Sequence, residues 1–465
     1  MDLREIKIPD LSMLWLVASA AVVGFVALSN AHLTGDEYAW LLLAREWIHH
    51  NAELYVSIVD NKGPVLIALY GIATLFVGYE ELVTALLGAV CIIVSAWCCV
   101  KLRKSVSGVD SFSIIVILAS PTLYGGTLLN SELLSGVLIL LATVAYFTSL
   151  RTLWLSTGLL LLAIFVNPKS LYFMVPLMGI LCLDLRRKGV HWLSTRVNFS
   201  SGLVLFGCTV AAFPLLSNYV DFMISLPKGD YYSRLPLFSS GCNEGFFSCV
   251  NNERVYLIKL FLKNPVTVFC IFSLAYSFYL RPSIPFAALI GVVFGYALIL
   301  FYVGRASGQY LIWLVLFGVI VIRQRHLLWV SALLVLAQFT PYKYTNVDPT
   351  LPADRSSDAR WFYFGRGEAA RFHYVADLRP CVADYANWFV YPLFFLDPAK
   401  NIDSVGNAYL NRYKAQINEC DPDMIIVSDS YYSTTEPKWL TDLLSKYQMT
   451  QQYTEQRVYE RKNQP

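Results

Sequence analysis

Charged residues early in the chain have side chains that could do acid–base and phosphate chemistry. Asp36 and Glu37 are adjacent in LTGDEYAW, and Lys62 lies in VDNKGP just before Pro64. A carboxylate can remove a proton from a hydroxyl group. A lysine beside backbone amides at a helix N-terminus, which Pro64 predicts, can bind an anion. The structural alternatives are an N-cap at Asp36 of a helix over 37–50, and an ordinary polar turn with a snorkelling lysine.

Three more charged residues lie beside apolar segments later in the chain. Glu132 opens one in GGTLLNSELL, Lys169 lies in FVNPKSLYF, and Arg305 lies in YVGRASGQY. Each one alone is typical of a first-turn acid or an interfacial anchor. On one common face, Lys62, Lys169 and Arg305 could bind a phosphate and stabilise its charge as it leaves. Asp36 and Glu132 would then supply carboxylates at the same face.

The composition indicates that a membrane protein carries these residues. Of the 465 residues, 56% are hydrophobic and only 15% are charged, and the mean hydropathy is +0.50. Soluble domains are about a quarter charged. The same values exclude intrinsic disorder, and a net charge of +3 with scattered basic residues excludes a dedicated nucleic-acid binder. The sequence therefore predicts a polytopic α-helical membrane protein.

Apolar segments recur, and the positive-inside rule orders them. Basic clusters such as 101–104 and 186–188 separate the segments into pairs, with the N-terminus in the cytoplasm and the C-terminus outside. The segment 64–79 is too short to span and is predicted to be a juxtamembrane or re-entrant helix on the outer side. The first span could instead be a cleaved signal peptide, but its length argues against this. The eleven predicted transmembrane helices are 11–29, 82–100, 111–127, 132–150, 152–167, 170–185, 199–218, 264–280, 284–303, 308–322 and 327–341.

The predicted outer regions divide the chain into two domains. Residues 1–341 form the transmembrane domain, whose first outer loop, 30–81, carries the candidate chemistry, and residues 342–465 form a soluble extracytoplasmic domain. In that tail, MIIVSD after Pro422 predicts a buried strand, 436–448 predicts a helix, and QRVYER predicts a strand. These elements indicate a small α/β domain.

Four of the ten cysteines fall in the predicted outer regions: Cys242, Cys249, Cys381 and Cys420. Two in the loop 219–263 and two in the tail predict one disulfide in each, in an oxidising compartment. Free thiols are the alternative. The absence of a CxxC pair or a nearby histidine argues against zinc. Ligand spacing neither supports nor excludes a divalent cation near Asp36 or Glu132.

The order of these motifs resembles the GT-C glycosyltransferases of the protein O-mannosyltransferase type, which include the aminoarabinose transferase of lipid A. Their first outer loop has an Asp-Glu pair, then a Tyr, an Asp and a Lys-Pro-Pro-Leu-like segment. The matching residues here are Asp36 and Glu37, Tyr55, Asp60, and Lys62 to Val65. GGTLLNSELL, VNPKSLYFMVP, GRASGQYLIWLVLFGVI, PDMIIVSDSYY and RVYERK are similar to later segments of bacterial members.

The resemblance implies a GT-C fold and roles for the matching residues. Asp36, with Glu37 beside it, would be the catalytic base, and Glu132 would be an active-site acid. Lys62 would lie near the donor phosphate, and Arg305 would lie near a donor-binding turn. Two departures weaken parts of the match: Gly63 replaces the first proline, and Gln309 stands where a histidine is common.

Together, the residues and the resemblance predict an integral-membrane glycosyltransferase, expected to invert. It would move a sugar from a polyprenyl-phosphate donor to a hydroxyl group of an extracytoplasmic glycan, lipid or protein. The expected location is the bacterial inner membrane, with the site in the periplasm; the ER lumen is the alternative. A transporter or flippase of an anionic lipid-linked substrate is the competing class, although no internal repeat typical of transporters is found. A polysaccharide polymerase or a non-catalytic relative is a third possibility.

Overall fold

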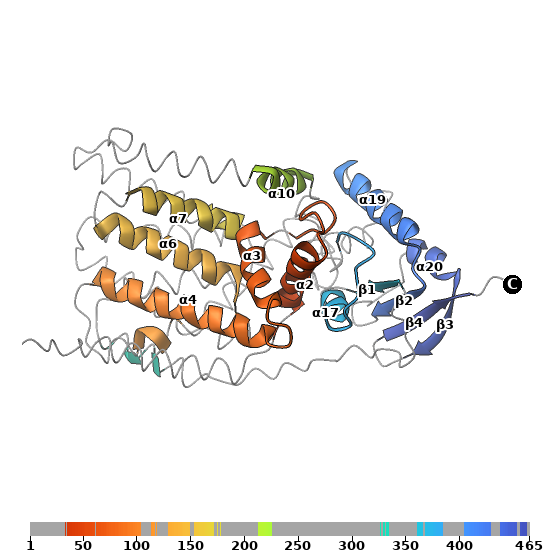
Figure 1. Ribbon diagram of the computed structural model, residues 1–465, viewed down its shortest axis with the longest axis horizontal. Helices are drawn as coiled ribbons and strands as arrows, with labels where there is room; N and C mark the ends of the chain where they lie inside the picture. The colour runs from red at the N-terminus through yellow and green to blue at the C-terminus, as the bar shows by residue number, and fades with distance from the viewer. Residues whose placement is uncertain are drawn as a thin grey trace, which may run out of the picture. The chain divides into compact units, whose positions relative to one another are not determined.

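The computed structural model contains two compact units (Figure 1). The first comprises Met1–Leu33, Phe76–Ala212 and Glu253–Tyr344, and the second comprises Thr34–Leu75, Phe213–Asn252 and Thr345–Pro465. The residues that the structure describes are 33, 35–60, 62–103, 113–116, 118, 129–148, 153–171, 174, 177, 213–225, 326, 329–330, 332–333, 360–365, 368–384, 404–428, 438–452 and 456–462.

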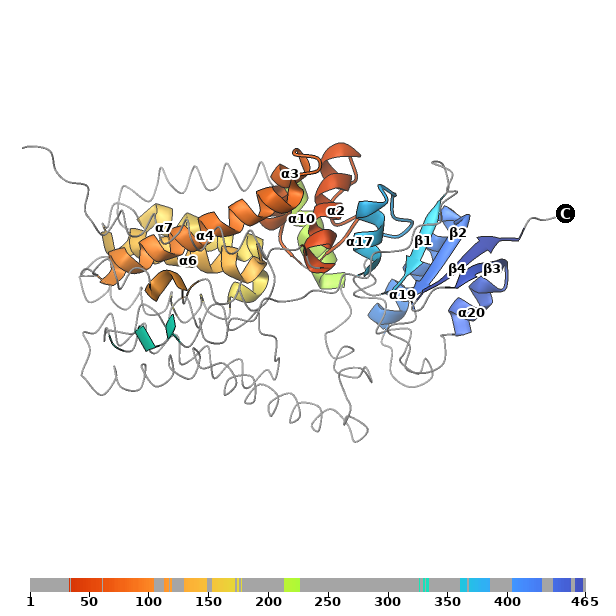
Figure 2. The same ribbon diagram turned by 90° about the horizontal axis from the view of Figure 1, so that it is seen from below.

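Three apolar helices make up most of the described part of the first unit. They are α4 (Glu80–Arg103), α6 (Ser131–Thr148) and α7 (Leu153–Val166), and the short 3-10 turn η3 (Pro168–Ser170) follows α7. Figures 1 and 2 both show α4, α6 and α7 side by side, with α6 in contact with each of the others. Acidic residues in the first turn of α4 and Lys101 and Arg103 at its end suit the helix dipole.

One described helix, over Glu80–Leu102, is long and apolar enough to cross a membrane. The apolar helices over Pro64–Thr74, Ser131–Phe147 and Leu155–Val166 are shorter. A stripe of α4 at helical spacing is exposed although it is apolar, which suits contact with lipid rather than water: Leu82, Leu86, Val90 and Ile93.

The predicted spans 82–100, 132–150 and 152–167 coincide with α4, α6 and α7. The other eight predicted spans lie wholly or mostly outside the described residues, so the count of eleven stays a prediction.

The second unit contains a four-stranded mixed sheet in the order β1-β2-β4-β3. Strand β1 (Trp361–Phe364) pairs in parallel with β2 (Met424–Ser428). Strand β4 (Gln456–Arg461) runs antiparallel to both β2 and β3 (Tyr447–Gln452). The parallel pair requires a long connection, and α17 (Glu368–Val375) and α19 (Ser404–Cys420) lie within it.

Helices cover both faces of this sheet. Alternate residues of β1 and β2 point to opposite faces, so each strand contributes to two apolar clusters. Helices α19 and α20 (Lys438–Leu444) cover the face formed by Phe362, Phe364, Ile425 and Val427. Helix α17 covers the face formed by Trp361, Tyr363, Ile426 and Val458. Figure 2 shows α17 on one side of the sheet and α19 with α20 on the other.

The first loop belongs to the same unit as the sheet. Helix α2 (Gly35–His49) packs against both α17 and α3 (Pro64–Thr74), and α10 (Phe213–Ser225) contacts α3. The tail therefore folds together with residues 34–75. The predicted domain boundary at residue 342 stays a prediction.

Several local predictions agree with these elements. The helix expected over 37–50 is α2, the strand in MIIVSD is β2, and the strand in QRVYER is β4. The helix expected over 436–448 is shorter, because α20 ends at Leu444 and Tyr447 and Gln448 belong to β3.

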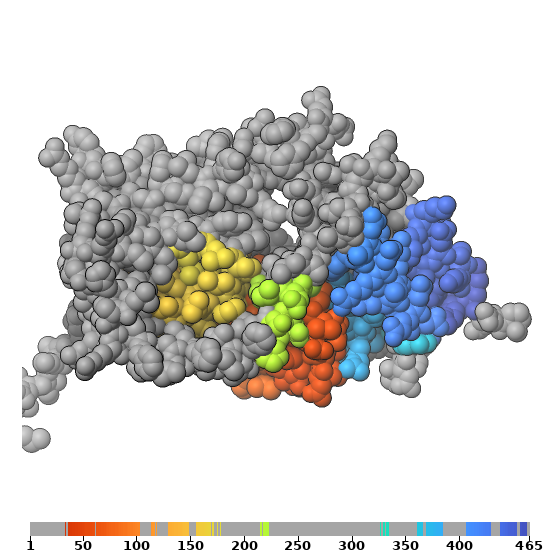
Figure 3. Space-filling view, turned by 90° about the horizontal axis from the view of Figure 1, so that it is seen from above, coloured from red at the N-terminus to blue at the C-terminus, as the bar shows by residue number. Residues whose placement is uncertain are grey.

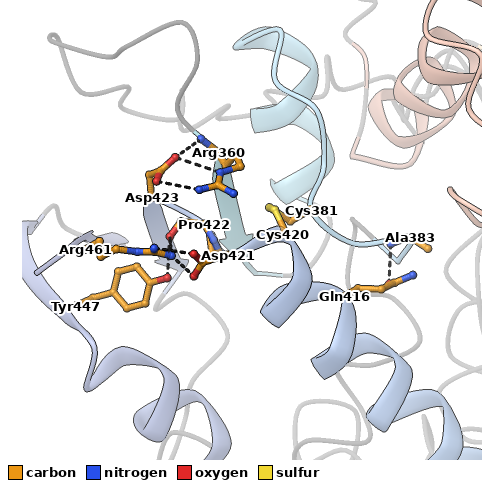
Figure 4. The surroundings of a disulfide bond; sticks show 10 residues. All are labelled: Arg360, Cys381, Ala383, Gln416, Cys420, Asp421, Pro422, Asp423, Tyr447 and Arg461. Carbon is orange, nitrogen blue, oxygen red and sulfur yellow. Dashed lines mark hydrogen bonds and ion pairs between the residues drawn. A yellow bond between two sulfur atoms is a disulfide. The ribbon is translucent and has the colours of Figure 1, made fainter. Parts of the chain in front are cut away.

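A disulfide joins Cys381 in the loop after α17 to Cys420, the last residue of α19 (Figure 4). Near it, the Ala383 N–H donates to the Gln416 side chain at 3.1 Å. The Arg461 guanidinium bonds to Asp421 just beyond the disulfide and holds the pKa of that carboxyl below its usual range. Cys242 and Cys249 lie outside the described residues.

Replacing Cys381 and Cys420 together by serine is expected to destabilise the tail by about 3–4 kcal/mol, because the disulfide closes a loop with a sequence separation of 39. The measurement is the melting temperature of the full chain in lipid nanodiscs. Non-reducing peptide mapping of the wild type gives the control, because it must recover the linked pair. An unchanged melting temperature in the double variant would contradict the expectation.

Candidate functional site

Lys62 is held in a tightly bonded loop between α2 and α3. Its backbone N–H donates to Oδ1 of Asp60 at 2.9 Å, and the Tyr55 hydroxyl donates to its carbonyl oxygen at 2.7 Å. All three residues are buried. Tyr55 has a φ of 69°, which is unusual for a non-glycine residue. The Tyr55 hydroxyl and the Asp60 carboxylate therefore hold the Lys62 backbone at its carbonyl and its N–H.

The Tyr55 ring is packed among other aromatic rings. Its centroid lies 4.8 Å from that of Tyr219 and 6.1 Å from that of Phe222, both on α10. Burial, Tyr219 and the charge of Asp60 raise the pKa of Tyr55 well above its ordinary value. The phenol therefore keeps its proton and remains a hydrogen-bond donor to the Lys62 carbonyl at neutral pH.

The Lys62 side chain turns toward α2. Its Nζ lies 5.8 Å from the ring centroid of Trp40, within the range of a cation–π interaction. Trp40 is four residues after Asp36, so the two share a face of α2, about 6 Å apart along its axis. The Lys62 ammonium thus packs on Trp40, which lies one helical turn after Asp36 on the same face of α2.

Asp36 and Glu37 lie in different environments. Glu37 is completely buried, and the Tyr70 hydroxyl lies 3.4 Å from its Oε1. Tyr70 also packs edge-on against Trp40, with centroids 5.3 Å apart. Asp36 is partly exposed. Because α2 begins at Gly35, the predicted N-cap at Asp36 is wrong: both acids lie in the first helical turn, where the helix dipole favours negative charge.

The N-terminus of α3 follows Lys62 directly. Pro64 is the first helical residue, as predicted, and Gly63 precedes it in an extended conformation with φ −77°. A proline could adopt this φ, so glycine at 63 does not change the path of the turn. No side-chain cap hydrogen bond occupies this helix N-terminus. Pro64 has no N–H and the Leu66 N–H donates to the Gly63 carbonyl oxygen at 3.2 Å, so Lys62 and the positive end of the α3 dipole are the groups that can face an anion here.

Arg45 fixes α2 to the tail. Its guanidinium donates to three carbonyl oxygens at the C-terminal end of α17 (Tyr374, His373 and Leu378, at 3.2, 3.4 and 3.0 Å). It also donates to the carboxylates of Asp377 at 2.9 Å and Glu46 at 3.1 Å. The His373 and Tyr374 carbonyls also accept from the N–H groups of Leu378 and Asp377, at 2.9 and 3.2 Å, so Arg45 adds a second donor to a C-terminal end that is already capped and joins α2 to it.

His373 is buried at this contact between α2 and α17. Burial and the Arg45 guanidinium lower its pKa to about 3. The imidazole is therefore neutral throughout the physiological range, while its unfolded-state pKa is about 6.5.

Glu132 lies in the first unit, at the start of α6. The Asn130 side chain caps this helix by accepting from the N–H groups of Glu132 and Leu133, at 2.6 and 3.2 Å. The buried Glu132 carboxylate accepts from the Ser131 hydroxyl at 2.8 Å and from Nδ2 of Asn167 at 3.0 Å. Asn167 directly precedes η3, so these bonds tie the start of α6 to the turn that contains Lys169.

The structure brings together part of the predicted site. In the second unit, the segments carrying Asp36, Glu37, Tyr55, Asp60 and Lys62 are packed together. In the first unit, Glu132 lies at the turn that contains Lys169, although the Lys169 side chain is not among those described. Arg305 lies outside the described residues.

The sequence interpretation missed three contributors: Trp40, Tyr70 and Asn167. Trp40 could have been found from its spacing, because it is one turn after Asp36. Asn167 stood in the same motif as Lys169, and its side-chain amide is an obvious partner for a buried acid.

Among the described residues, no three histidine, cysteine or acidic side chains gather in a way that could hold a metal ion. The sequence left a divalent cation near Asp36 or Glu132 open, and the described residues do not change this.

Comparisons with known proteins include weak similarities to two solved structures. No family model matches the sequence, and no curated protein sequence matches it. The crystal structure of ArnT from Cupriavidus metallidurans bound to undecaprenyl phosphate is 13% identical, with a TM-score of 0.42 over 96% of this chain and 97% of that one. The Archaeoglobus fulgidus oligosaccharyltransferase in complex with Zn and sulfate is 12% identical, with a TM-score of 0.43 over 88% and 68%. Similarities this weak do not establish a common fold.

Acid is expected to destabilise the second unit through His373. The unfolded chain takes up a proton as the pH falls below about 6.5, whereas the folded chain does not until about pH 3, so stability falls by about 1.4 kcal/mol per pH unit between these values. The measurement compares melting temperatures of the wild type and His373→Gln at pH 7.5 and 5.0. The variant should lose less stability than the wild type, by about 2 kcal/mol. Equal losses would contradict the assignment.

Asn167→Asp is expected to destabilise the first unit by about 3 kcal/mol or more, because it places a second buried carboxyl beside Glu132. Asn218→Asp is a matched control, since Asn218 donates to Glu53 at the same distance of 3.0 Å but at the surface. It should change stability by less than about 0.5 kcal/mol. The measurement is thermal unfolding of both variants, and equal shifts would refute a buried acid at residue 132.

Proposed function

We propose that this chain is an integral-membrane glycosyltransferase. It takes a sugar from a polyprenyl-phosphate donor and joins it to a hydroxyl group of a glycan, lipid or protein on the outer side of the membrane. One observation carries most of the proposal: the Lys62 ammonium lies over Trp40, which shares a face of α2 with Asp36. The lysine is thus packed on a residue one helical turn from the acid, so a cation for a phosphate and a carboxylate for a hydroxyl proton lie at the same end of α2.

The proposed reaction is a single displacement. Asp36 accepts the proton of the acceptor hydroxyl, and the hydroxyl oxygen bonds to the anomeric carbon of the donor sugar. The bond from that carbon to the phosphate oxygen breaks, which inverts the anomeric configuration and releases polyprenyl phosphate. Lys62 and the positive end of the α3 helix dipole stabilise the phosphate as its negative charge grows.

The remaining candidates have supporting roles in this proposal. Lys169 and Arg305 add positive charge at the same phosphate, and Glu132 is a second acid of the site. Asp36 is the base rather than Glu37 because it is partly exposed, whereas Glu37 is buried against Tyr70. Glu37 therefore supports α2 and the Tyr70 ring.

The proposed location is the bacterial inner membrane, with the second unit in the periplasm. The high mean hydropathy and the helix over Glu80–Leu102 support a membrane protein. The disulfide between Cys381 and Cys420 supports an oxidising compartment for the tail.

The test is mass spectrometry of the lipids that copurify with the full chain. Asp36→Asn should retain an unspent polyprenyl-phosphate sugar, because it binds the donor without a base. Lys62→Ala, and Lys62→Ala combined with Arg305→Ala, should release the donor. Asp221→Asn and Lys446→Ala alter exposed charges elsewhere in the second unit and should behave as the wild type.

Transfer activity in membranes completes this test. Asp36→Asn should lower it by about 10²–10⁴-fold, the usual contribution of a general base. A transporter that uses Asp36 only within a helix start would keep most of its activity. Donor retention that is equal in Asp36→Asn and the lysine variants would exclude a phosphate-binding role for Lys62.

A further inference from the structure

Helix α10 packs against the loop that holds Lys62, and the proposed reaction gives this helix no role. Figure 3 shows α10 in green against the first-loop segment in red on one surface of the second unit. Two aromatic residues of α10, Tyr219 and Phe222, are buried and three residues apart, so they share one face of the helix. Their ring centroids lie 4.8 and 6.1 Å from that of Tyr55. This face of α10 therefore covers the loop at Tyr55.

Tyr219 lies beside both residues that hold the Lys62 backbone. Its ring packs on Tyr55, whose hydroxyl donates to the Lys62 carbonyl oxygen. Burial and the negative charge of Asp60, which accepts from the Lys62 N–H, raise the pKa of Tyr219 well above its ordinary value. The Tyr219 phenol therefore stays neutral and adds no charge beside the lysine. One side chain of α10 thus supports both contacts to Lys62.

Tyr55 depends on this packing because its backbone conformation is disfavoured. A φ of 69° is an outlier for a bulky residue, and such conformations persist only where the surrounding structure holds them. If the Tyr219 ring is lost, the Tyr55 side chain can leave its place, and the Lys62 carbonyl then loses its donor. The Lys62 ammonium, which lies 5.8 Å from the ring centroid of Trp40, gains freedom to move away from α2.

Other supports of this loop end on its backbone. The Val59 N–H donates to the Ala383 carbonyl oxygen at 3.1 Å, and Arg412 donates to the Val56 carbonyl oxygen at 2.9 Å. These bonds keep the loop attached to the tail when a ring of α10 is removed. Removing one ring should therefore move the lysine without releasing the whole loop.

We propose that Tyr219 is a positioning residue for the donor phosphate, acting through Tyr55 and Asp60 to keep the Lys62 ammonium in place. This inference rests on the proposed glycosyltransferase function and adds to it a residue from the predicted outer loop 219–263. The Tyr219 ring does not need to touch the phosphate, because its effect reaches the lysine through the backbone contacts at residue 62.

The first test measures the exposure of Lys62 by labelling with acetic anhydride and mapping the labelled peptides by mass spectrometry. The full chain is used in lipid nanodiscs. Lys62 is buried and should label slowly in the wild type, whereas the exposed Lys446 serves as the internal standard. Tyr219→Leu should raise the labelling rate of Lys62 at least about fivefold, and Tyr219→Phe, which keeps the ring, should stay within about twofold of the wild type.

Two controls separate positioning from a general loss of stability. Tyr363→Leu removes another buried tyrosine ring of the same unit, which packs on Phe372 with centroids 5.2 Å apart. It should lower the melting temperature but leave Lys62 labelling unchanged. Asp221→Asn alters an exposed charge on α10 and should behave as the wild type. Equal labelling of Lys62 in Tyr219→Leu and Tyr363→Leu overturns the proposal.

The second test measures donor retention in the Asp36→Asn background. Adding Tyr219→Leu should lower the retained polyprenyl-phosphate sugar at least about fivefold, and Tyr219→Phe should restore it. If Tyr219→Leu does not fold, Phe222→Leu replaces it in both tests, because Phe222 supplies the second ring beside Tyr55. Loss of the donor with no change in Lys62 labelling also overturns the proposal.

The two readouts distinguish failure of this inference from failure of the proposed function. Donor retention in Asp36→Asn that Tyr219→Leu does not change leaves the glycosyltransferase and removes the positioning role. Lys62 labelling that depends on Tyr219, without any donor retained by Asp36→Asn, leaves the contact between α10 and the loop and removes the proposed reaction.

Discussion

The guanidinium of Arg45 is the constraint on which the second unit depends. The two terminal nitrogens of the planar guanidinium donate to the carbonyls at the end of α17 and to two carboxylates. Helix α17 in turn covers one face of the sheet. The first loop is therefore part of the fold of the tail domain. The strained turn at Tyr55 and the position of Lys62 depend on these contacts.

Elements governed by neighbouring residues could be predicted from the sequence. Pro64 marks the start of α3, and a turn at Pro422 followed by an apolar run marks β2. Strand β1 was missed because WFYF is buried on both faces and shows no alternation of polar and apolar residues. The boundaries of α20 were wrong because Tyr447 reads as helical spacing but pairs in a strand.

The candidate site was predictable in its residue types but not in its contacts. The adjacent acids Asp36 and Glu37 gave no sign of which one would be buried, since this depends on Tyr70, 33 residues away. The role of Tyr55 came only from the family resemblance, whereas the structure gives it a bond to the backbone of Lys62. Such partners are distant in sequence, and no local pattern encodes them.

The separation of these partners along the chain has a consequence during synthesis. Arg412 bonds to Val56 across 356 residues, so α2 and its loop leave the ribosome long before the tail that receives them. At about 5–20 residues per second, the delay is roughly 20–70 s. During that interval α2 can pack against α3, but Arg45 and the side of α2 that contacts α17 have no docking surface. We therefore expect chaperones to bind the nascent first loop. Cells that lack these chaperones should degrade more of the chain.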